Sequence, residues 1–184
     1  RNDSSGIAFF GESCGAARSN CCEENRKDGI YLGDTAAPEL IENNCNRNED
    51  SGIAYRNESS GEARGNICEE NKQQGIYLDE KAFPELIENE CNSNDDSGIA
   101  YFGERGGTAY QRERGGESLM LWDYFRGEAS ANCCKWNGNC GIYVSQCAST
   151  KLIENKCISN LVSGIAFRGG SDGEVKGNLC EHNV

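Results

Sequence analysis

The chain has 184 residues, a length typical of one domain, and no apolar run approaches the roughly 18 residues of a membrane span. Its net charge of -12 excludes the basic footprint of a nucleic-acid-binding protein. Only 36% of its residues are hydrophobic, which is low for a globule but typical of a thin solenoid. We also expect no signal peptide in this sequence.

From its sixth residue onward the chain repeats one unit of 23 residues seven times. Each unit opens on Gly-Ile and continues to an Asn, a Cys and a second Asn at constant spacing. The opening glycines are Gly6, Gly29, Gly52, Gly75, Gly98, Gly141 and Gly164. Only the interval from Gly98 to Gly141 differs, because it holds 20 extra residues. A fixed period in this range indicates a stacked-repeat architecture.

The repeat predicts vertical columns of identical side chains. One column is Cys22, Cys45, Cys68, Cys91, Cys134, Cys157 and Cys180. Another is Asn20, Asn43, Asn66, Asn89, Asn132, Asn155 and Asn178. We expect the Cys column to point inward as small apolar side chains, and the Asn column to form structural hydrogen-bonded ladders at bends.

Within each unit, short runs of β-branched and aromatic residues end at Gly, Asn or Ser, which predicts strands of three to five residues. Stacked units then form parallel sheets along the molecule. The pattern Gly-Ile-x-(Val/Tyr/Leu) followed by Asn-x-Cys-x-x-Asn resembles the right-handed parallel β-helix repeat of the pectin-lyase-like superfamily, including its NosD-like and carbohydrate-binding members. The resemblance implies an all-β solenoid of about seven coils in a single domain, residues 1–184, with a loop insertion at about 105–124.

That superfamily contains lyases, hydrolases, epimerases and inert scaffolds, so the resemblance leaves function open. The chain has one His, His182, the third residue from the end of the sequence, and no recognisable cluster of carboxylates for polysaccharide cleavage. We therefore expect a non-enzymatic structural protein: a rigid extracellular or cell-surface building block, with the periplasm as an alternative location. It would self-associate head to tail into a fibre or form part of a longer repeat protein.

Two alternatives are a carbohydrate-binding module and a degenerate polysaccharide lyase, hydrolase or epimerase. The first is suggested by Tyr31, Tyr77 and Tyr143, which alternate with Ala from unit to unit at the position after Ile. Tyr31 and Tyr77 would stand about 9.6 Å apart, close to a disaccharide repeat, so a polysaccharide is the alternative partner. In the insertion, Trp122 and Tyr124 would either cover one flank of the solenoid or add an aromatic wall to this site.

The remaining cysteines suggest two disulfide candidates, Cys140 with Cys147 and Cys14 with Cys21, which would suit a secreted protein. Asn2 and Asn57 begin possible glycosylation triplets. No cofactor or resident metal is expected. The shared column of Glu39, Glu62 and Glu85 leaves open a weakly bound cation such as calcium, because stacked carboxylates repel one another.

Overall fold

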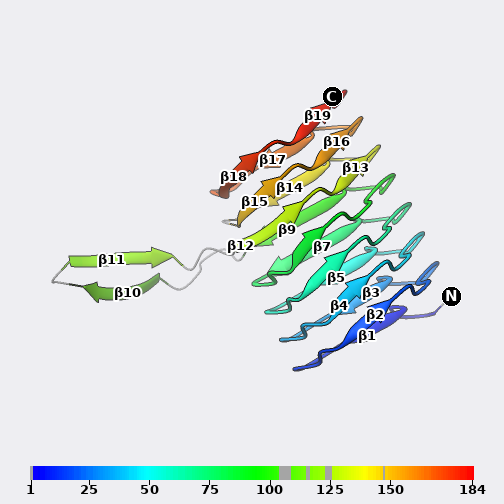
Figure 1. Cartoon of the computed structure of the whole chain (residues 1–184), viewed down its shortest axis with the longest axis horizontal. Coiled ribbons are helices and arrows are strands. Elements are labelled where there is room, and N and C mark those ends of the chain that lie inside the picture. The colour runs from blue at the N-terminus through cyan, green and yellow to red at the C-terminus, as the bar shows by residue number, and fades with distance from the viewer. Residues whose placement is uncertain (1, 104–108, 115–116, 123–125, 147) are drawn as a thin grey trace.

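The computed structural model describes residues 2–103, 109–114, 117–122, 126–146 and 148–184. These residues form strands, turns and bends and contain no helix, so no helix there could cross a membrane. The strands stack as the rungs of a β-solenoid of about seven turns, with the two ends of the described chain at opposite ends of the stack (Figure 1). The predicted all-β solenoid is confirmed.

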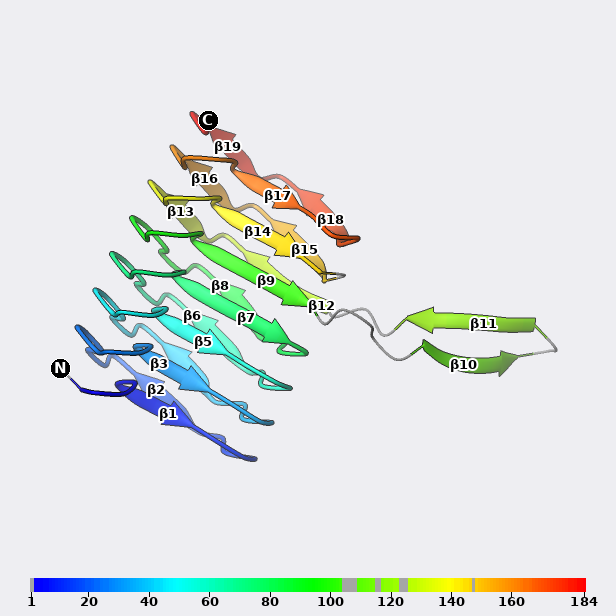
Figure 2. The same ribbon diagram turned by 180° about the vertical axis from the view of Figure 1, so that it is seen from behind.

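Three parallel sheets run along the solenoid (Figures 1 and 2). The first sheet contains β1 (Ile7–Phe9), β3 (Ile30–Leu32), β5 (Ile53–Tyr55), β7 (Ile76–Glu80), β9 (Ile99–Gly103), β14 (Ile142–Ser145) and β17 (Ile165–Phe167). The second contains β2 (Ala16–Arg18), β4 (Glu39–Ile41), β6 (Glu62–Arg64), β8 (Glu85–Ile87), β12 (Arg126–Ser130), β15 (Ser149–Ile153) and β18 (Asp172–Lys176). The third contains β13 (Cys133–Lys135), β16 (Lys156–Ile158) and β19 (Leu179–Glu181).

Strand pairing keeps the register that the repeat predicts. Ile7 pairs with Ile30 in the first sheet, and Cys134 pairs with Cys157 in the third. In the earlier rungs the third sheet is continued only by isolated parallel β-bridges, which link Cys21, Asn44, Ile67, Glu90 and Cys133 in that order. Each rung therefore has three straight segments joined by bends.

The core fills by pairing large with small residues across the solenoid. Tyr55 of the first sheet shares its rung with Ala63 of the second, and Tyr101 shares its rung with Ala129. All four side chains are fully buried. The rung between them places Leu78 and Leu86 in the two columns, so the total side-chain volume of these three rungs stays nearly constant, as a close-packed interior requires.

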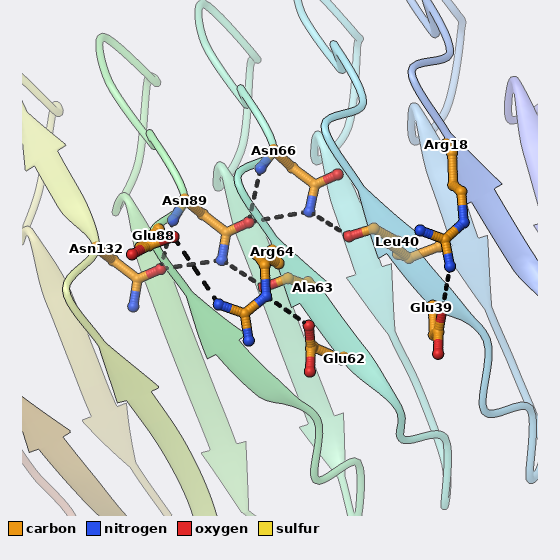
Figure 3. Close-up of polar contacts among 10 residues, drawn as sticks. All are labelled: Arg18, Glu39, Leu40, Glu62, Ala63, Arg64, Asn66, Glu88, Asn89 and Asn132. Atoms are coloured by element: carbon orange, nitrogen blue, oxygen red, sulfur yellow. Dashed lines mark hydrogen bonds and ion pairs between the residues drawn. The ribbon is translucent and has the colours of Figure 1, made fainter.

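Buried asparagines hold the bends together. The Asn66 amide nitrogen donates to the Leu40 carbonyl at 2.8 Å and to Asn89 Oδ1 at 2.9 Å (Figure 3). The same pattern recurs in the next rung, where the Asn89 amide donates to Ala63 and Asn132. Each amide thus bonds the rungs on both sides, and the Asn column forms a continuous hydrogen-bonded ladder.

The insertion contains an antiparallel hairpin of β10 (Ala109–Arg114) and β11 (Glu117–Trp122). It extends away from the stack between β9 and β12 (Figures 1 and 2), so it does not lie along a flank as a cover. The 20-residue insertion does not disturb the stacking of the repeats, because Ile142 of the next unit pairs directly with Ile99.

Candidate functional site

Aromatic side chains form a ribbon along the outer face of the first sheet. Tyr77 and Phe102 have ring centroids 5.4 Å apart, and Phe102 and Tyr143 are 5.5 Å apart. Further toward the N-terminal rungs, Phe10 lies 5.3 Å from Tyr31. This aromatic ribbon runs across the strands, parallel to the solenoid axis, and provides flat surfaces of the kind that stack on sugar rings.

The ribbon rests on small residues. Ala54 and Ala100 also point outward from the first sheet, but the larger neighbours on either side bury them almost completely. The three tyrosines are partly exposed. The alternation of Tyr and Ala therefore produces a ridged face with an exposed ring on every second rung.

A charged group interrupts the ribbon between Tyr31 and Tyr77. The Arg56 guanidinium carbon lies 4.7 Å from the Tyr77 ring centroid, and Arg56 Nη1 donates to Asp79 Oδ2 at 2.9 Å. The Arg56 side chain is 42% exposed to solvent, and the Asp79 side chain is 26% exposed. The ion pair and the ring hold the guanidinium in one place, yet leave it accessible to a ligand on this face.

The electrostatic environment sets the protonation of this group. Burial raises the pKa of Tyr77 above its usual value, and the Asp79 carboxylate raises it further. Burial alone would lower the pKa of Arg56, but Tyr77 and Asp79 more than offset this, so it is raised. At neutral pH the site therefore presents a cationic Arg56 next to a protonated Tyr77 hydroxyl, a combination that can bind an anion and donate a proton.

Asp28, which is buried just before β3 and interacts electrostatically with Arg56, should make stability depend on pH. Burial raises its pKa to about 6, and the Ser51 N–H, which donates to Asp28 Oδ1 at 3.2 Å, partly counteracts that shift. The folded state consequently binds this proton more tightly than the unfolded state. The contribution of Asp28 to stability is therefore fully present below about pH 4 and is lost as the pH rises through about 6.

We therefore expect Asp28→Asn, which keeps an acceptor for Ser51, to raise the free energy of unfolding by about 2–3 kcal/mol at pH 7.5. The difference in free energy of unfolding between Asp28→Asn and the parent protein should decrease below pH 6 and be small near pH 4. Urea denaturation at a series of pH values measures it, with the exposed Asp172→Asn as the matched control. A pH-independent effect of Asp28→Asn would contradict this account.

The predicted ligand-binding residues divide into two groups. Tyr31, Tyr77 and Tyr143 lie on one face as expected. Tyr124 lies outside the described residues, and Trp122 belongs to the projecting hairpin, where only the backbone is described. A contact between the insertion and the tyrosines therefore stays a prediction.

Sequence reasoning missed Phe10, Arg56, Asp79 and Phe102 as members of this site. All four occupy one column, four residues after the opening Gly of their units. The residue type at this position differs from unit to unit, so the repeat does not draw attention to it. The position lies two residues after the Tyr column on the same outward-facing side of the strand, and this could have indicated that it belongs to the same surface.

Two members of the Glu column of the second sheet, Glu39 and Glu62, form ion pairs with arginines. Glu39, Glu62 and Glu85 lie in register. Arg18 forms an ion pair with Glu39, and Arg64 Nε lies 2.7 Å from Glu62 Oε1 (Figure 3). These arginines reduce the repulsion that suggested a bound cation, and calcium binding stays a prediction.

The non-ladder cysteines are free thiols where the structure describes them. Cys14 and Cys21 are exposed and Cys140 is buried, while Cys147 lies outside the described residues. Both disulfide candidates therefore stay predictions. Of the glycosylation candidates, Asn2 is exposed and Asn57 partly exposed.

Two solved structures resemble this fold over most of the chain. The A-module of the mannuronan C-5 epimerase AlgE4 of Azotobacter vinelandii aligns with a TM-score of 0.65 and 13% identity, over 89% of this chain and 45% of that one. A double mutant of the periplasmic alginate epimerase AlgG aligns with a TM-score of 0.71 and 18% identity, over 95% and 48%. The chain thus spans about half the length of each. A search of curated protein sequences finds no match.

These similarities correct one expectation. A non-enzymatic structural role was wrong as the favoured interpretation, because both of these structures are carbohydrate-modifying enzymes. The sequence criterion, which looked for a His base and a recognisable carboxylate cluster, was a poor one, because stacking brings together side chains that are far apart in the sequence. Head-to-tail self-association stays a prediction.

A family model described as a right-handed β-helix region matches residues 1–111. This match covers more than half of the chain and agrees with the observed stack of parallel sheets. The chain belongs to the right-handed β-helix family.

Proposed function

We propose that this chain is the β-helix part of a polysaccharide-modifying enzyme that acts on uronate polymers. The supporting observation is the aromatic ribbon with Arg56, Tyr77 and Asp79 set into it. Rings stack on sugars, and a guanidinium binds carboxylates. The structural similarity to two alginate epimerases favours uronates over neutral sugars.

The polymer would lie along the solenoid axis, across the strands of the first sheet. Tyr31, Tyr77 and Tyr143 would contact sugar rings, and Arg56 would bind one carboxylate. Because the protein and the polymer are both anionic, we expect affinity to increase with moderate salt, which screens their overall repulsion. An extracellular or periplasmic location follows from such a substrate, in keeping with the periplasmic AlgG.

Proton exchange at C-5 of a uronate is the reaction that this group supports. The hydrogen at this carbon becomes more acidic when the adjacent carboxylate is neutralised, and Arg56 supplies that positive charge. The Asp79 carboxylate, which contacts Arg56, would accept the C-5 proton as the general base. Tyr77, kept protonated by burial and by Asp79, would donate its proton to the carbon, and the proton held by Asp79 would then pass to the Tyr77 oxygen. Arg56 therefore stabilises the developing charge, and Tyr77 acts as the general acid.

The test is incubation with polymannuronate in deuterated buffer, followed by NMR detection of deuterium at C-5. We expect Arg56→Gln to reduce incorporation by about 100-fold or more, the typical effect of losing one charge-stabilising donor. Tyr77→Phe should reduce incorporation while leaving polymer affinity nearly unchanged. Tyr143→Ala should instead weaken binding about tenfold, since losing one stacking ring costs about 1 kcal/mol.

Arg18→Gln, an exposed arginine of the second sheet, is the matched control and should leave both quantities unchanged. Polygalacturonate and a neutral glucan test substrate class. Absence of both binding and C-5 exchange on every uronate polymer would overturn the proposed function.

A further inference from the structure

Two arginines bracket the longest unbroken part of the aromatic ribbon. Tyr77, Phe102 and Tyr143 lie on three consecutive rungs, with ring centroids 5.4 and 5.5 Å apart. Arg56 lies on the rung before these three, and Arg168 lies on the rung after them. Only Arg56 has a role in the proposed function.

Arg168 occupies the same position in its rung as Arg56 does in its own. Arg56 directly follows the last residue of β5, and Arg168 directly follows the last residue of β17. The Arg56 backbone N–H donates to the Leu32 carbonyl of the preceding rung at 2.9 Å. The Arg168 N–H donates to the equivalent carbonyl, that of Val144, at 2.8 Å. The backbones of the two arginines are therefore held in the same way.

Both arginine side chains lie on the outer face of the first sheet. The residue before each arginine, Tyr55 or Phe167, packs in or against the hydrophobic core. Successive side chains of an extended chain point to opposite faces, so each arginine points away from the core. Arg168 is accordingly exposed. It extends the face that carries the ribbon.

Arg168 forms no ion pair with a residue that the structure describes. The protein contains 30 acidic residues but only 18 lysines and arginines, so an arginine without an acidic neighbour stands out. Acidic side chains form ion pairs with Arg18, Arg26, Arg47, Arg56 and Arg64. The neighbour of Arg168 in its own column is Ser145, which carries no charge. The Arg168 guanidinium is therefore available to the carboxylate of a ligand.

The separation of Arg56 and Arg168 fits a linear polymer that lies along the solenoid axis. Arg168 lies four rungs beyond Arg56, and neighbouring rungs are about 4.8 Å apart, so about 19 Å separates the two positions. This distance is twice the interval of about 9.6 Å between Tyr31 and Tyr77, which is close to a disaccharide repeat. Carboxylates two repeats apart on a regular polymer have the same orientation. Both can therefore face the same side of the first sheet.

We propose that Arg168 is a second carboxylate-binding residue, which holds a sugar two disaccharide repeats away from the sugar that Arg56 binds. This inference rests on the proposed function, because the carboxylates are those of a uronate polymer. The rings of Tyr77, Phe102 and Tyr143 would contact the sugars in between. A ligand then needs about five sugars to contact both arginines. The second contact adds affinity only for ligands long enough to reach it.

The experiment compares the binding of trimannuronate and hexamannuronate by isothermal titration calorimetry. Arg168→Gln should weaken hexamer binding about fivefold, the upper end for one exposed ion pair, and leave trimer binding unchanged. Arg168→Lys, which keeps the charge, should recover part of the loss. Lys156→Gln, at an exposed position of the third sheet, is the matched control for the loss of one positive charge and should bind both ligands as the parent protein does.

The deuterium-exchange assay separates this inference from the proposed function. Arg168→Gln should raise the polymannuronate concentration needed for half-maximal exchange about fivefold, with a smaller change in the maximal rate. Hexamer binding unchanged in Arg168→Gln, equal weakening of trimer and hexamer, or the same loss in Lys156→Gln would overturn the role of Arg168 and leave the proposed function in place. If the parent protein neither binds nor exchanges any uronate polymer, the proposed function and this inference both fail.

Discussion

Replacing Asn66 with Ala should lower the free energy of unfolding by about 3–5 kcal/mol, enough to unfold a large fraction of a marginally stable domain. Asn66 is fully buried, and its oxygen accepts from both the backbone N–H and the side-chain amide of Asn43 at 2.9 Å. Its own amide donates to Leu40 and Asn89. Alanine would leave buried donors and acceptors in both adjacent rungs without partners, at about 1–3 kcal/mol each.

Asn20→Ala is the matched control, since Asn20 lies in the same column at its partly exposed first rung. Its amide donates to Asn43 at 2.9 Å, but the bends there remain accessible to water. We expect a loss of about 1 kcal/mol. Chemical denaturation with fixed salt and pH measures both variants. Equal losses for Asn66→Ala and Asn20→Ala would show that burial does not set the strength of the ladder.

Replacing Gly52 with Ala should be similarly severe. A Cβ atom on Gly52 would lie 2.7 Å from the Gly75 carbonyl oxygen and 2.8 Å from the Cys68 Cβ. Both neighbours are fixed by the strand pairing on either side, so the rungs would have to separate. We expect a loss of at least about 3 kcal/mol, at the upper end of overpacking effects.

Gly11→Ala separates this clash from the intrinsic effect of removing a glycine. Gly11 has a φ of +63°, but a Cβ there would meet nothing within 4 Å. Its substitution should cost about 1–2 kcal/mol through backbone strain alone. Thermal denaturation followed by circular dichroism compares the two. A Gly52→Ala protein as stable as Gly11→Ala would contradict the close stacking of the rungs.

The regular part of the molecule could be predicted because each rung repeats the same residue types at the same positions and therefore packs and bonds in the same way. Ile30 and Cys45 recur every 23 residues, and in-register stacking places identical side chains above one another. The Asn ladder followed in the same way, since a buried amide at a bend finds its partner in the next copy. The hairpin was not predicted, because the insertion has no counterpart from which its pairing could be inferred.

The candidate site depended on contacts between residues that do not repeat. Arg56 and Asp79 are separated by 23 residues and differ in type, so no column marks them as a pair. Their meeting requires both the register of β5 with β7 and the particular side-chain orientations that place the guanidinium over Tyr77. Likewise, only the packed core reveals that the buried Tyr55 hydroxyl has no hydrogen-bond partner among the described residues.

The amino-acid sequence by itself determined the period, the direction of the Ile and Cys columns and the all-β solenoid, because these depend on spacing along the chain. The tertiary structure alone decided which non-repeating side chains of adjacent rungs meet. Stacking brings residues 23 positions apart to within about 4.8 Å, and at that distance the charge, size and hydrogen bonding of individual side chains determine the site.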